Sequence, residues 1–359
     1  MTTPGSSKEQ QLQSDIITFL RFPLIVGVVM IHARLSNLYG VDIEQTASDV
    51  FPIYKSVSYL FSQILARSAV PLFLFFSGFL FFRHVETFSS EIYWGKVKKR
   101  LFTLFIPYLI WNTLYALELQ TVEILAPGLI QNPPPAYSEL KYWLLVFYAP
   151  INYPLLFVKE LMIVVLCSPI IFRLIKRIPT LFLVFIGIVW AFSYHFSPGG
   201  DHIITALFFF SLGAYFSISK IDFANLFKRY LALFSAGYLL AASLTFFYQH
   251  DECLVYLKPI TFLLGGCFVL GLTAKLVGEK GWKIDPFLSE CSFFIFVFHV
   301  PILSITRRIL QSICHWDTDI ELTIFYFVWA TSMVIIGIGT YSILRKLFPK
   351  LAAILTGGR

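Results

Sequence analysis

Two ionisable residues, Arg21 and His32, lie in an apolar segment near the start of the chain. Eleven residues separate them, and at 3.6 residues per turn this spacing places them on nearly the same face of a helix. Histidine exchanges protons near neutral pH, and a guanidinium binds anions or stabilises developing negative charge. The pair therefore predicts a helix suited to general-base chemistry or anion binding. A histidine bonded to a neighbouring helix and an arginine reaching the membrane surface would give the same pattern.

Further ionisable side chains interrupt later apolar segments, where each is costly unless it is paired or hydrated. Lys159 and Glu160 are adjacent, so their side chains point about 100° apart on a helix and need not pair with each other. Reaching to the membrane surface explains single members of this set but explains the whole set poorly. The set comprises Arg67, Lys159, Glu160, His299, Arg307 and Arg308.

The composition identifies the class of protein that must position these residues. Of the 359 residues, 57% are hydrophobic and 14% are charged, and 39 are phenylalanine. Soluble domains average about 45–50% apolar and 25% charged residues, and disordered chains are poor in aromatics. Five cysteines are too few for a disulfide scaffold. The sequence therefore predicts a polytopic membrane protein.

Ten stretches are apolar enough to span a bilayer as helices, which need about 20 residues. Continuous apolar runs such as residues 71–76 lack the alternation of a membrane β-barrel. The fold class expected is an all-α membrane helix bundle. The stretches are 15–33, 57–82, 101–118, 155–174, 180–196, 202–217, 229–248, 257–276, 287–310 and 322–346.

The distribution of the 28 lysine and arginine residues predicts the orientation. With ten spans and a cytoplasmic N-terminus, four of them fall outside and five fall within spans, and all the others fall inside, as the positive-inside rule requires. Both termini are then cytoplasmic, with tails at 1–14 and 347–359 around a membrane domain at 15–346. The net charge of +7 is explained by this topology, so we expect no nucleic-acid partner. The four outside residues are Arg34, Lys55, Lys141 and Lys258.

Three function classes fit intramembrane histidine, arginine and glutamate. They are a membrane transferase, a transporter or flippase of an anionic or glycan substrate, and a polymerase or ligase acting on lipid-linked sugars. The sequence contains no zinc-type cysteine and histidine cluster and no phosphate-binding loop, so we expect no metal. Cys253 and Cys314 both map to the outer side, where a disulfide is allowed but not required.

Five segments, in this order, resemble the acyltransferase 3 family of integral-membrane, acyl-CoA-dependent acyltransferases. The first pairs Arg21 with His32 at the family's spacing. The sequence departs from the family pattern at Thr103, where a second basic residue is common, and at Lys159-Glu160, where the family has Arg-Asp. The other four segments are AVPLFLFFSGFL (69–80), KRL with IPYLIW (99–101 and 106–111), PLLFVKEL (154–161) and FHVP (298–301).

The resemblance implies transfer of an acyl group, commonly acetyl, from acyl-CoA to a hydroxyl of an envelope or cell-surface carbohydrate or glycolipid. It implies a multi-pass protein of the inner membrane without a permanently bound cofactor. On this basis His32 is the expected base and Glu160 its expected orienting partner, while Arg21 is expected to hold the donor phosphates or the oxyanion. Donor contacts are expected at Arg67, Arg100 and Lys159, and acceptor contacts at His299 and Arg307.

Overall fold

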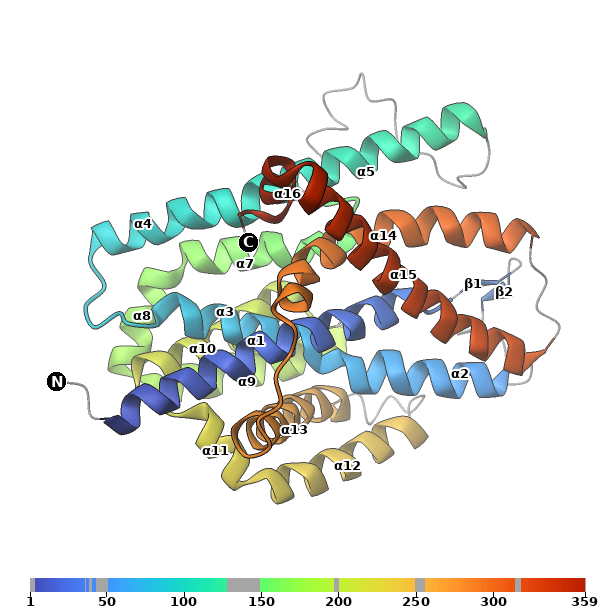
Figure 1. Ribbon diagram of the computed structural model, residues 1–359. Helices are drawn as coiled ribbons and strands as arrows, with labels where there is room; N and C mark the ends of the chain where they lie inside the picture. Colours follow the sequence, from blue (N-terminus) through green and yellow to red (C-terminus); the bar gives the residue numbers. More distant parts are fainter. Residues whose placement is uncertain are drawn as a thin grey trace. The chain divides into compact units, whose positions relative to one another are not determined.

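The computed structural model of the protein describes residues 4–35, 37–38, 41–42, 51–127, 149–196, 200–248, 256–313 and 318–358. Within these ranges the regular structure is helical apart from one two-residue antiparallel pair, β1 (Asn37–Leu38) with β2 (Val41–Asp42) (Figure 1). The all-α polytopic membrane fold expected from the apolar runs is therefore confirmed.

Each of the ten predicted stretches coincides with helix, although the number of spans is approximate. In the described residues, seven helices are long and apolar enough to cross a membrane, and two bent pairs raise the number to nine if each pair is one span. The pairs bend by 61° after Leu166 and by 106° after Ile218. The remaining stretch, 229–248, corresponds to the shorter apolar helix Leu231–Phe247. The seven are Lys8–Ala33, Pro52–Phe82, Ser90–Leu125, Pro179–Phe196, Leu257–Gly278, Pro286–Arg307 and Asp319–Leu347.

Two helices begin well before the apolar stretches that predicted them. Helix α1 (Pro4–Ala33) starts eleven residues before position 15, so the expected tail over 1–14 includes its first turns. Helix α4 (Ser90–Arg100) continues through a π-helical stretch, Leu101–Phe105, into α5 (Ile106–Leu125). Hydropathy misses these extensions because they are largely polar and need no burial in lipid. The cytoplasmic placement of both termini stays a prediction.

The chain divides into two compact units, each built from several separate segments. The first unit comprises Met1–Ile31, Tyr59–Val97 and Ile163–Glu290, and the second comprises His32–Ser58, Lys98–Met162 and Cys291–Arg359. The first unit contains α3 (Ala69–Phe82), α8 (Ser168–Arg177), α9 (Pro179–Phe196), α10 (His202–Ile218), α11 (Phe223–Arg229), α12 (Leu231–Phe247) and α13 (Leu257–Gly278). The second contains α2 (Pro52–Tyr59) up to Ser58, α5, most of α7 (Leu156–Leu166) and of α14 (Pro286–Ile313), α15 (Asp319–Leu347) and α16 (Pro349–Thr356).

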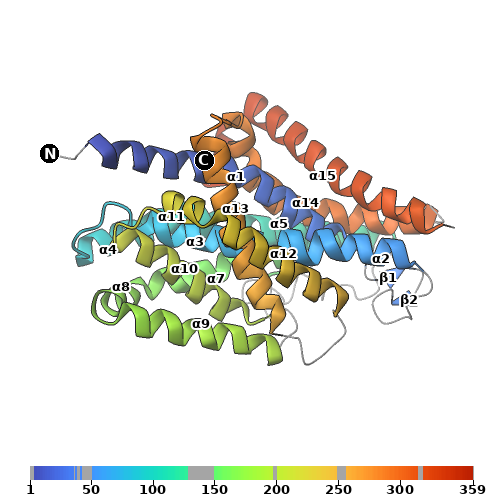
Figure 2. The same ribbon diagram turned by 90° about the horizontal axis from the view of Figure 1, so that it is seen from below.

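In the first unit, α3 and α10 pack with their backbones in direct contact (Figures 1 and 2). A Cβ atom at Gly78 would lie 2.0 Å from the carbonyl oxygen of Phe210, and one at Gly213 would lie 1.9 Å from that of Phe75. Any side chain at either position would force the helices apart. The two glycines therefore set the distance between α3 and α10, as small residues do in membrane helix pairs.

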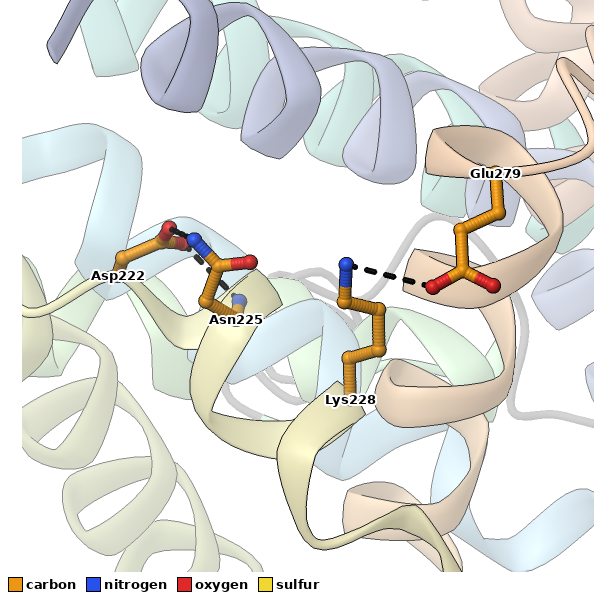
Figure 3. A network of polar contacts seen from close by, with 4 residues as sticks. All are labelled: Asp222, Asn225, Lys228 and Glu279. Atoms are coloured by element: carbon orange, nitrogen blue, oxygen red, sulfur yellow. Dashed lines mark hydrogen bonds and ion pairs between the residues drawn. The ribbon is translucent and has the colours of Figure 1, made fainter. Parts of the chain in front are cut away.

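Helix α11 is held at both ends by the polar contacts in Figure 3. The carboxylate of Asp222 caps it by accepting from the first backbone N–H groups, and it also accepts from Asn225 Nδ2 at 2.6 Å. The side-chain amide of Gln13, in α1, also donates a hydrogen bond to this carboxylate, at 3.0 Å. Lys228 Nζ lies 3.5 Å from Glu279 Oε1, just after α13. These contacts fix α11 after the sharp bend that follows α10.

The second unit is joined by hydrogen bonds between helices. Trp329 Nε1 of α15 donates to Thr306 Oγ1 of α14 at 3.3 Å. Trp111 Nε1 of α5 donates to the carbonyl oxygen of Leu355 in α16 at 3.0 Å. The carboxylate of Asp319 accepts from the backbone N–H of Tyr54, at 2.6 Å, and so anchors the start of α2. Cys253 and Cys314 lie outside the described residues, so the disulfide considered above stays open.

Candidate functional site

His32 lies in the last turn of α1, where its side chain is half-buried. Its Nδ1 atom is 2.9 Å from the hydroxyl oxygen of Tyr153, and the two rings meet edge to face with centroids 4.8 Å apart. Tyr153 opens a short 3-10 turn, Tyr153–Leu155, before α7, and its side chain is exposed. The imidazole is thus partly accessible, and its Nδ1 atom is in contact with the Tyr153 hydroxyl.

A second imidazole, His299 of α14, lies beside His32, with ring centroids 5.3 Å apart. His299 is buried, and its Nδ1 atom is 3.1 Å from the carbonyl oxygen of Ile295. Because a carbonyl only accepts hydrogen bonds, Nδ1 must carry the proton and Nε2 of the neutral ring must be an acceptor. Within the described part of the chain this Nε2 has no hydrogen-bond partner. The structure therefore places an unsatisfied acceptor next to His32.

The segment that carries Tyr153 is fixed to α14 through a carbonyl that Pro301 leaves unsatisfied. Proline has no N–H, so the helix cannot form the usual bond from residue 301 back to Val297. The Asn152 side chain takes its place, with Nδ2 donating to the Val297 oxygen at 2.9 Å. The backbone N–H of Asn152 also donates to Asn112 Oδ1 of α5, at 3.4 Å. Asn152 is fully buried, and it fixes the position of the residue that follows it.

Two arginines of this unit act electrostatically on Tyr54, and one of them also acts on Tyr153. Arg307 of α14 is close enough to Tyr153 and to Tyr54 for its charge to act on both hydroxyls. Arg34, two residues after His32, acts on Tyr54 in the same way and donates from Nε to Ser58 Oγ at 3.3 Å. Guanidinium groups near an imidazole and a phenol favour an anionic or polar ligand at this position. Of the predicted site residues, His32, His299 and Arg307 are thus grouped around Tyr153.

Arg21 is on the same helix as His32 but not in this group. Its side chain is exposed and belongs to the first unit. Between the two residues, Ile25 and Val28 occupy nearly the same face of α1, and both are buried. The spacing predicted from the sequence is therefore present, with apolar side chains between the two ionisable ones.

The expected donor residues lie in different parts of the chain. Arg67, in the first unit, is half-buried, and its Nε donates to Gln63 Oε1 at 2.9 Å. The helix around it changes to π-helix over Leu60–Leu65 and to 3-10 helix over Ala66–Ser68, and such interruptions often accompany functional sites. Arg100, in the second unit, is half-buried at the end of α4.

Lys159 and Glu160 lie in α7 of the second unit. Lys159 is half-buried and Glu160 is buried. Phe157, one turn earlier than Glu160, packs edge to face against Phe296 of α14, which sets the position of this helix in the unit. The structure gives Nδ1 of His32 a phenol as its partner, and the orienting role of Glu160 stays a prediction.

Sequence reasoning missed Tyr153 and the two asparagines, Asn112 and Asn152, that lie behind it. Two signals pointed to the asparagines, and neither pointed to Tyr153. Asparagine in an apolar stretch requires a hydrogen-bond partner, and a proline inside a helix leaves a carbonyl that requires a donor.

No group of three histidine, cysteine, aspartate or glutamate residues suited to a metal ion occurs in the ranges that the structure describes.

Comparison with known proteins gives two matches to the chain. Residues 15–342 match the family model described as an acyltransferase domain. A relative, the succinoglycan biosynthesis protein ExoH of Rhizobium meliloti (strain 1021), is 26% identical over 363 positions, covering 96% of this chain and 92% of the relative. No solved structure matches the chain. The likeness thus extends over nearly all of the membrane-spanning segments.

Proposed function

The chain belongs to the acyltransferase 3 family, and on this premise we propose that it transfers an acyl group from acyl-CoA to a hydroxyl of a cell-envelope carbohydrate. We propose acetyl as the acyl group and the inner membrane as the location. The acceptor is a polysaccharide or its glycolipid precursor, and the name of the relative ExoH, a succinoglycan biosynthesis protein, supports this class. Acyl-CoA is a substrate in this proposal, which includes no permanently bound cofactor.

The reaction needs a base for the acceptor hydroxyl and positive charge for the oxyanion. In the proposed step, His32 removes the hydroxyl proton as the oxygen attacks the thioester carbonyl carbon. The tetrahedral oxyanion then collapses, the carbon–sulfur bond breaks, and the imidazolium returns the proton to the leaving thiolate. The products are an O-acyl ester and free coenzyme A, so the proton and electron pairs balance without an oxidant or a metal.

The observation that carries this proposal is the position of the His32 imidazole. It is half-buried at the end of a membrane helix, and Arg307 lies close to the tyrosine bonded to it. Because Nδ1 is engaged by Tyr153, proton transfer with a substrate is assigned to Nε2. The unsatisfied acceptor of His299 suits a hydroxyl-bearing ligand, which supports placing the carbohydrate on this side.

The donor residues are proposed from their charge and their position in the family motifs. Arg21 would bind the donor phosphates or the oxyanion, and Arg67, Arg100 and Lys159 would add contacts to the anionic coenzyme. A guanidinium holds a phosphate through two parallel hydrogen bonds, which a lysine cannot do. Lys159, which replaces the arginine of the family segment, therefore contributes as a point charge.

The direct test is label transfer from acetyl-CoA with radiolabelled acetyl by the purified protein in detergent, with membrane glycans as acceptor. We expect labelled glycan with the wild-type protein and a loss of about 10²- to 10⁴-fold in rate with His32→Ala, the range for a missing general base. Equal rates for the two proteins would contradict the base assignment. Arg173→Lys, an exposed change on α8, serves as the control for handling and folding.

The same purified protein, reconstituted into vesicles, distinguishes an enzyme from a transporter or flippase. Uptake of a glycan or anion by these vesicles without formation of a covalent product would assign a transporter or flippase. A complementary measurement is the mass of the envelope glycan with and without the chain. A shift by one acyl group would identify both the acyl group and the acceptor.

A further inference from the structure

The hydrogen bond between Tyr153 and His32 determines which nitrogen of His32 can act as the base. A neutral imidazole carries one proton, on either Nδ1 or Nε2. If Nε2 is to remove a proton from the acceptor, it needs its lone pair, and the ring proton must then be on Nδ1. Nδ1 lies 2.9 Å from the Tyr153 oxygen, which can accept that N–H.

We propose that Tyr153 is a positioning residue that holds His32 in the Nδ1–H form, with its hydroxyl oxygen as the acceptor of that hydrogen bond. The inference rests on the proposed function, since only a base at Nε2 requires this form. Tyr153 touches the ring of His32 and acts on the reaction through it. The phenol oxygen has two lone pairs and one proton, so it accepts from Nδ1–H and still donates elsewhere.

The structure explains why the phenol stays in place although its side chain is exposed. Tyr153 follows Asn152, whose buried side chain is bound to the Val297 carbonyl that Pro301 leaves without its helical donor. The Leu155 N–H donates to the Asn152 carbonyl oxygen at 2.8 Å and closes the 3-10 turn that begins with Tyr153. The proline two positions after His299 therefore also helps to orient His32, through Asn152 and Tyr153.

The kinetic test compares Tyr153→Phe with the wild-type protein in the acetyl-CoA assay. Phenylalanine keeps the ring contact with His32 and removes only the hydroxyl. We expect kcat to fall about tenfold, the amount that one lost hydrogen bond commonly costs, with KM for both substrates unchanged. Tyr230→Phe, the same change at an exposed position between α11 and α12, is the matched control. An unchanged kcat, or a rise in KM alone, would overturn the proposal.

A spectroscopic test does not depend on activity. In protein labelled with ¹⁵N-histidine, the His32 signals are identified by their loss in His32→Ala, and protonated and unprotonated ring nitrogens differ clearly in shift. We expect the Nδ1–H form in the wild-type protein and an increased share of the Nε2–H form in Tyr153→Phe. A wild-type ring already in the Nε2–H form, or no change in the variant, would overturn the assignment.

The supporting contacts provide a further variant. In Pro301→Ala, the restored N–H at position 301 can bind the Val297 carbonyl and displace Asn152 Nδ2. We expect a decrease in kcat smaller than that of Tyr153→Phe and no further decrease when both changes are combined, because they act through the same contact. Fully additive effects would show that Pro301 acts independently of Tyr153.

These readouts distinguish failure of the positioning role from failure of the proposed function. If the wild-type protein transfers no label, the acyltransferase proposal fails, and the ¹⁵N spectra still decide whether Tyr153 sets the form of His32. If label is transferred and Tyr153→Phe is as active as the wild-type protein, the acyltransferase stands and the positioning role is wrong.

Discussion

The ring centroids of His32 and His299 lie 5.3 Å apart. The His32 ring is half-buried at the end of α1, and the His299 ring is buried within α14. The two residues are 267 positions apart in the sequence, and each presents a nitrogen that can take part in hydrogen bonding. Among the residues that the structure describes, none forms a hydrogen bond with Nε2 of His299, and a buried unsatisfied group costs about 1–3 kcal/mol. That cost is expected where a site must receive a polar ligand.

We predict that His299→Phe lowers activity without lowering stability. The change removes the unsatisfied acceptor and the Nδ1–H bond to the Ile295 carbonyl, which keeps its helical partner, the backbone N–H of residue 299. An aromatic ring stays among apolar neighbours, so the melting temperature in detergent should stay equal to that of the wild-type protein or rise. We expect KM for the carbohydrate acceptor to rise about tenfold, which corresponds to one lost hydrogen bond. His299→Gln, which offers a carbonyl acceptor, should recover part of the affinity. Full activity of His299→Phe would remove His299 from the acceptor site.

Arg21→Lys tests whether the guanidinium shape is needed. Lysine keeps the charge and loses the two parallel hydrogen bonds to a phosphate. We expect KM for acetyl-CoA to rise about tenfold while the protein inserts and folds normally, as judged by gel filtration in detergent. Arg173→Lys provides the matched control on an exposed face of α8. Wild-type kinetics for Arg21→Lys would reduce Arg21 to a point charge or a structural residue.

The close contact of α3 and α10 predicts severe damage from a single methyl group. In Gly213→Ala the new Cβ would lie 1.9 Å from the Phe75 carbonyl oxygen, and backbone cannot move aside as a side chain can. We expect a loss of about 3 kcal/mol or more in stability, seen as poor recovery of folded protein in detergent. Gly339→Ala, whose new Cβ would have no neighbour within 4 Å beyond the adjoining turns of its own helix, should behave like the wild-type protein. Similar recovery of the two variants would contradict the packing of these helices.

The contacts around α11 predict unequal effects of two charge removals (Figure 3). Asp222→Ala removes the helix cap and the partner of Gln13, so we expect a loss of about 1–2 kcal/mol in stability. Glu279→Gln removes only the solvent-accessible ion pair with Lys228, and its effect should stay below about 1 kcal/mol. Thermal unfolding of both variants in the same detergent makes the comparison. A larger effect for Glu279→Gln would contradict this ranking.

The sequence alone determined the helical membrane fold, because a bilayer requires about 20 apolar residues per crossing and such runs are visible in composition. It placed helix in all ten stretches, whereas the starts of α1 and of α4 lay outside the apolar pattern. Polar residues that continue a helix beyond lipid carry no hydropathy signal. Hydropathy therefore located the apolar segments and missed the polar helical ends.

The sequence also marked His32, His299 and Arg307, because an ionisable group in an apolar segment is rare and costly. It did not reveal Tyr153, since this residue lies just before the predicted stretch 155–174 and nothing local distinguishes it from the other tyrosines of the chain. Only the tertiary structure pairs Tyr153 with His32, through a carbonyl on α14 and an amide from the segment before α7. Hydropathy is a sum over neighbouring residues, whereas a hydrogen bond between segments far apart in the chain exists only once they have packed together.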